Sequence, residues 1–116
     1  MQMKEKIRHL LQQAEEYREG SLEGRARVTA RLAVAESLRL YYTFLNKTLP
    51  TGSAFDLINS TAEDKSVPAD VRDLLVHFIE RVDTSYHLPG DFDLIADARQ
   101  ISQWVINKTN GMGENK

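Results

Sequence analysis

A stretch of 25 residues without glycine or proline, from Arg25 to Leu49, constrains the fold of this chain more than any other feature. Apolar residues recur in this stretch at steps of three and four, which predicts a helix with two apolar sides. A helix at a protein surface needs only one apolar side, so we expect a central helix with neighbours on both flanks. One stripe comprises Val28, Leu32, Ala35, Leu38, Tyr42, Leu45 and Leu49, and the other comprises Ala26, Ala30, Ala33, Ser37, Tyr41 and Phe44.

Helical periodicity continues along the rest of the chain, and no segment alternates as a strand would. We expect a first helix over residues 3–18, a short one over 53–61, a further one from 66 to about 85 and a last one from 92 to about 108. Gly20 lies where a helix would end, whereas Ser21 and Asp91 can cap the helices that follow them. The sequence therefore predicts an all-α fold, an antiparallel bundle of four main helices plus one short helix, with the long second helix at its centre. Residues 1–109 are expected to form a single domain and residues 110–116 a flexible C-terminal tail.

Composition narrows the chemistry that this chain can perform. Its 116 residues are 41% hydrophobic and 28% charged, with a formal net charge of −2, so no broad positive field favours nucleic acid. The absence of cysteine excludes disulfides, thiolate nucleophiles and cysteine-ligated metals. No apolar segment reaches the ~20 residues that a membrane span requires. We expect a cytoplasmic protein without a cofactor.

Residues 72–77 read RDLLVH, in which a polar residue follows Arg72 and four residues separate Arg72 from His77. This pattern resembles the signature of the HEPN superfamily, a group of small helical-bundle proteins. Residues 40–42, 81–86 and 98–105 resemble further segments of that superfamily, so the likeness covers about residues 26–106. For active members the resemblance implies a metal-independent ribonuclease, with Arg and His acting on the RNA 2′-hydroxyl and phosphate between two subunits. Other members lack catalysis and bind nucleotides or proteins.

The candidate catalytic residues are Arg72, His77 and Asp73. Arg72 and His77 lie about 140° apart around a straight helix, so a long Arg side chain or a second subunit would have to bring them together. Asp73 and His77 are four residues apart and share a face, which would let the carboxylate orient the imidazole for acid–base work. The alternative is a solvated helix edge with ordinary ion pairs. Ile79 stands where the ribonuclease members often carry a tyrosine.

Three further groups of residues are candidates for binding. Arg27 and Arg31 share a helix face and could hold a phosphate, pair with nearby glutamates or simply be solvated. Trp104 falls off the main apolar stripe of its helix, which is typical of a partner surface. A third group, comprising Asp91, Asp93 and Asp97, fits the start of a helix and its dipole better than a metal site, so no metal is expected.

These observations favour a small non-catalytic helical module for protein–protein interaction or self-association. The partner would be another protein or a second copy of the chain. The alternative is a ribonuclease or nucleotide-binding, toxin-like protein that uses Arg72 and His77, with RNA or a nucleotide as its ligand.

Overall fold

The computed structural model describes residues 3–48, 53–79 and 93–113, which form five α-helices and no strand. The all-α class expected from the sequence is therefore confirmed for the described residues. Two expectations concern residues outside the described ranges: the last part of the helix that should reach Ser85, and the cap at Asp91. The helices are α1 (Met3–Glu19), α2 (Glu23–Phe44), α3 (Ala54–Ala62), α4 (Ala69–Ile79) and α5 (Leu94–Gly113).

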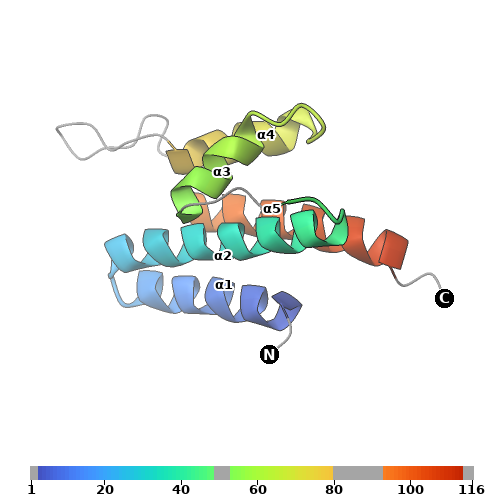
Figure 1. The fold of residues 1–116 in the computed structure, drawn as a ribbon. Coiled ribbons are helices and arrows are strands. Elements are labelled where there is room, and N and C mark those ends of the chain that lie inside the picture. The colour runs from blue at the N-terminus through green and yellow to red at the C-terminus, as the bar shows by residue number, and fades with distance from the viewer. Residues whose placement is uncertain (1–2, 49–52, 80–92, 114–116) are drawn as a thin grey trace.

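Helices α1, α2 and α5 lie side by side, and polar contacts fix the direction of α5 (Figure 1). Arg18 near the end of α1 contacts Asp93, just before α5, with a nitrogen–oxygen distance of 2.9 Å. Lys4 near the start of α1 contacts Asn110 in the last turns of α5. Helix α5 therefore runs antiparallel to α1. Because α1 and α2 form an antiparallel hairpin, α5 runs in the same direction as α2.

The second layer is a hairpin of α3 and α4 that lies over α2 and α5 (Figure 1). Side-chain contacts attach it at both helices: the hydroxyls of Tyr42 and Thr61 lie 3.2 Å apart, and Nδ1 of His77 lies 2.7 Å from Oδ2 of Asp97. The arrangement of four main antiparallel helices is not confirmed, since α2 and α5 are parallel neighbours. After α3 and α4, helix α5 begins at the same end of the first layer as α2, and the two helices therefore run in the same direction.

Helix α2 is central, as the sequence indicates, but its two apolar stripes have different surroundings. The second stripe is buried from Ala26 to Tyr41. The first is buried only from Ala35 to Tyr42, Leu45 is partly buried, and Val28 and Leu32 keep 50% and 43% of their surface exposed. The expectation that these two side chains face inward is wrong, because no described element covers this side of the first three turns.

The helix ends show where local sequence rules applied and where they failed. Ser21, and not Gly20, adopts the left-handed conformation that closes α1, with a φ of 63°. The amide of Leu22 then donates to the carbonyl of Tyr17, and that of Ser21 to Arg18, so Ser21 ends α1 and does not cap α2.

Asn46, with a φ of 59°, closes α2 in the same way, earlier than Pro50 would require. Ser53 caps α3, with a reciprocal contact to Asp56. The carboxylate of Asp93 accepts from the amide of Ala96 at the start of α5. At its other end α5 continues past Lys108 to Gly113, and the buried Thr109 hydroxyl donates to the carbonyl of Ile106. None of the described helices is both long and apolar enough to cross a bilayer.

Candidate functional site

Among the sequence candidates that the structure describes, His77 and Asp97 are brought into direct contact by the fold. His77 lies in the last turn of α4 and Asp97 in the first turn of α5, and Nδ1 of the imidazole is 2.7 Å from Oδ2 of the carboxylate. Asp97 is buried at 8% exposure and His77 is partly buried. The contact fixes the orientation of the imidazole and supplies the buried carboxylate with a hydrogen-bond partner.

The carboxylate that holds Nδ1 of His77 is thus that of Asp97 and not that of Asp73, which the sequence pattern favours for this role. Asp73 is exposed on α4. The sequence could have identified Asp97, because this residue lies on the buried stripe of its helix with Leu94, Ala98 and Ile101. A carboxylate on an apolar face requires a partner across the interface.

Arg72 is held at the other end of α4 from His77. Its Nε donates to the backbone carbonyl of Val67 at a distance of 3.0 Å, which ties the side chain to the residues just before the helix. The contact gives a hydrogen-bond donor to a carbonyl that lies just before the first residue of α4. The Arg72 guanidinium and the His77 imidazole are therefore each held by different elements.

The most exposed apolar surface on α2 adjoins the arginines singled out from the sequence. Val28 and Leu32 are one turn apart and exposed, and Arg27 and Arg31 follow the same spacing on the neighbouring side. Arg25 borders the opposite edge. We call these five residues, Arg25, Arg27, Val28, Arg31 and Leu32, the α2 face.

The three arginines of the α2 face have no carboxylate partner among the described residues, whereas three other arginines do. Arg18, Arg39 and Arg99 each form an ion pair, with Asp93, Glu36 and Glu15 respectively. Within the described part of the chain no ion pair involves Arg25, Arg27 or Arg31. Of the alternatives considered for Arg27 and Arg31, pairing with nearby glutamates is therefore not observed in this part of the chain.

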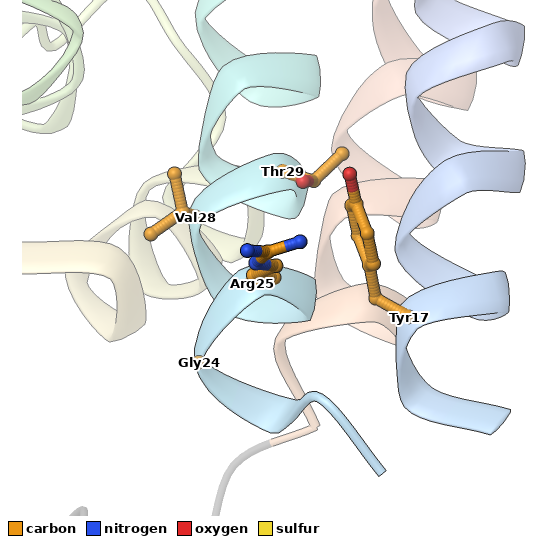
Figure 2. A pocket seen from close by; sticks show the side chains of 5 residues that line it. All are labelled: Tyr17, Gly24, Arg25, Val28 and Thr29. Atoms are coloured by element: carbon orange, nitrogen blue, oxygen red, sulfur yellow. The ribbon is translucent and has the colours of Figure 1, made fainter. Parts of the chain in front are cut away.

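A shallow groove of about 320 Å³ opens at the N-terminal end of the α2 face. Figure 2 shows Tyr17 of α1 and Thr29 of α2 pointing toward one another, with Arg25 beside them and Val28 projecting from the other side of α2. The Arg25 guanidinium lies 6.0 Å from the centre of the Tyr17 ring. Gly24 also lines the groove, and a Cβ added there would meet nothing within 4 Å. This glycine leaves room beside the first turn of α2.

Trp104, the expected partner surface, packs against its own protein. Its ring lies 5.0 Å from that of Tyr41, centre to centre, with a tilt of 47°. The side chain is partly exposed at the edge of the core. Sequence spacing identified Trp104 and missed Val28 and Leu32, because both lie on a stripe that continues into the buried half of α2.

The acidic residues at the start of α5 have separate structural roles. Asp93 pairs with Arg18, and the hydrogen bond from this guanidinium is the main cause that lowers the pKa of the Asp93 carboxyl. Asp97 pairs with His77. In the described ranges no group of three or more histidine or acidic side chains is placed to hold a metal ion.

Comparison with models of known families, with curated proteins and with solved structures finds no match to this chain.

Proposed function

We propose that this chain is a non-catalytic helical module that binds another protein through the α2 face. The observation that carries this proposal is the pair Val28 and Leu32, which stay exposed on a helix whose other half is buried. Single exposed apolar residues are common on protein surfaces. Here two of them adjoin a groove and three arginines without ion pairs, and such a combination is typical of a binding surface.

The area available on the α2 face suits a modest interface. Fully burying a Val or Leu side chain contributes about 1.5–3 kcal/mol, and roughly half of each of these side chains is still exposed. The groove beside Gly24 can take one further side chain of a partner. A few anchored side chains usually dominate the affinity of a protein interface.

Capture experiments with matched variants test this function. The wild-type chain, the double variant Val28→Ser/Leu32→Ser and the control Val76→Ser are immobilised and exposed to extract from the cells that express the protein. Val76 is a suitable control because it is 40% exposed on α4, away from the α2 face. We expect a protein retained by the wild type and by Val76→Ser but lost with the double variant. Equal retention by all three folded proteins would contradict a role for the α2 face.

A second candidate function, a metal-independent ribonuclease or nucleotide-binding protein, is favoured by the contact between His77 and Asp97. An imidazole oriented by a carboxylate can transfer protons near neutral pH. This candidate predicts RNA cleavage that disappears in His77→Ala and in Arg72→Ala. Absence of both RNA binding and cleavage by the wild type at low salt would remove it.

A further inference from the structure

We propose that the segment bound by the α2 face is an acidic amphipathic helix of another protein. This inference rests on the proposed function and adds the chemistry of the partner. The partner would place apolar side chains on Val28 and Leu32, insert one of them into the groove beside Gly24, and place carboxylates against Arg25, Arg27 and Arg31.

Charge is the first argument for an acidic partner. The chain as a whole carries a net charge of −2, yet three arginines gather on the α2 face without a carboxylate among the described residues. Guanidinium groups bind carboxylates in a bidentate geometry, and complementary charge sets the specificity of such a contact.

Arg31 supplies a second, independent argument. Its Nε is covered by neighbouring atoms and has no hydrogen-bond partner among the residues that the structure describes. A covered donor without a partner costs free energy, which makes Arg31 unusual among the side chains of this structure. A carboxylate bound at Arg31, with a rotation of the side chain, would supply the missing acceptor.

The shape of the surface favours a helix over an extended segment. Helix α2 satisfies its own backbone groups and therefore offers no free edge to an extended chain, whose amides and carbonyls would lose water without gaining partners. A helix satisfies its own backbone and presents apolar residues at steps of three and four. This spacing matches Val28 and Leu32, which are one turn apart.

Two other occupants fit the α2 face less well. A second copy docked through the same face would bring the arginines of both copies together, and like charges oppose such contact. RNA would satisfy the arginines but would place phosphates beside the apolar pair Val28 and Leu32. An acidic amphipathic helix satisfies both parts of the surface.

Selection from a random library of 14-residue peptides displayed on phage tests the proposal directly. Wild-type protein is the bait, and the folded variant Arg27→Glu/Arg31→Glu is used for counter-selection. We expect enriched peptides with Leu, Phe or Trp at steps of three and four and with an excess of Asp and Glu. Enrichment of neutral or basic peptides, or equal enrichment by the charge-reversed variant, would overturn the acidic class.

Direct binding of one enriched peptide then separates this inference from the proposed function. Fluorescence anisotropy should show at least a tenfold weaker affinity for the same peptide with Lys in place of its acidic residues. We expect a similar loss for Gly24→Leu, which places a side chain at the groove from a position where an added Cβ meets nothing within 4 Å. If the acidic and basic peptides bind equally but Val28→Ser/Leu32→Ser abolishes binding, the α2 face stands and the acidic class fails.

Two further outcomes would also overturn the acidic class. One is a dimer in light scattering that Val28→Ser/Leu32→Ser dissociates. The other is tight binding of a 20-nucleotide RNA that depends on Arg27 and Arg31. If no enriched peptide loses affinity in Val28→Ser/Leu32→Ser, then the proposed function itself fails. Circular dichroism of each variant confirms that it retains its helical fold.

Discussion

At the scale of single residues, the contact between His77 and Asp97 joins the α3–α4 hairpin to α5. Removing the imidazole leaves a carboxylate buried at 8% exposure without this partner. We expect His77→Ala to lower the free energy of unfolding by about 1–3 kcal/mol, measured by urea denaturation at neutral pH. His77→Gln should recover part of the loss, because its amide can still donate to Asp97.

The exposed Asp73 on the same helix provides the control for this prediction. Asp73→Asn should change the free energy of unfolding by less than about 0.5 kcal/mol, as substitutions on an open surface usually do. If His77→Ala and Asp73→Asn have equally small effects, then water satisfies Asp97 and the imidazole is not needed for stability.

The partner of His77 illustrates which part of the site could be predicted from the sequence. His77 was identified from its spacing to Arg72, and Asp97 was noted only as one of several acids at the start of a helix. The contact between them depends on how α4 crosses α5, and this geometry is set by packing between segments far apart in the chain. Local patterns locate each group but do not show which groups meet.

At the scale of the helices, two of the leucines of α2 offer a matched test of which side faces inward. Leu38 is fully buried and Leu32 is 43% exposed, and both have the same chemistry in the same helix. We expect Leu38→Ala to cost about 2–5 kcal/mol of unfolding free energy, because it leaves a cavity in the core. Leu32→Ala should cost less than about 1 kcal/mol. Similar losses in urea denaturation would show that the α2 face is buried in solution.

The turn between α1 and α2 can be stabilised by one substitution. Ser21 adopts a φ of 63°, a conformation in which a Cβ is crowded and which glycine adopts readily. We expect Ser21→Gly to raise the free energy of unfolding by about 0.5–1 kcal/mol. Ser21→Ala should give no gain, since alanine retains the Cβ. Thermal denaturation of the three proteins would show whether the order of stability is Gly, then Ser and Ala.

Most helices could be predicted from the sequence because their signals are local. The spacing of apolar residues, the cap at Ser53 and the breaks near Gly20 and Pro50 all act within a few residues. The direction of α5 could not be predicted this way. It depends on contacts such as Arg18 with Asp93, which lie far apart in the chain and become visible only in the fold. The exposure of Val28 and Leu32 was missed for the same reason, since it depends on where the hairpin of α3 and α4 ends.

At the scale of the whole molecule, the fold lowers the pKa values of two carboxyl groups, and stability should therefore depend on pH. The pKa of Asp93 is lowered mainly by the hydrogen bond from Arg18, which joins α1 to the start of α5. The pKa of Asp64, between α3 and α4, is lowered mainly by the hydroxyl of Ser66, with a smaller contribution from its amide. Both carboxyls are therefore held in the charged form by groups that the unfolded chain does not keep in place.

A carboxyl whose pKa is lower in the folded state stabilises the protein at pH values above its pKa in the unfolded state. This contribution is lost as the pH falls through its pKa in the folded state. We therefore expect the free energy of unfolding to be nearly constant from about pH 7 to 5 and to fall below about pH 4. Asp93→Asn and Ser66→Ala should each reduce stability at neutral pH and flatten the acid loss. Urea denaturation at a series of pH values provides the measurement.

Salt distinguishes the two carboxyls in the same experiment. The ion pair of Arg18 and Asp93 is largely exposed, so about 0.5 M NaCl should screen it and remove most of the effect of Asp93→Asn. The hydrogen bonds from Ser66 to Asp64 act at contact and persist in salt, so the effect of Ser66→Ala should remain. If salt removes both effects alike, then the Ser66 contacts do not hold Asp64 in its charged form. If acid destabilises both variants as steeply as the wild type, then carboxyls other than Asp64 and Asp93 cause the loss of stability in acid.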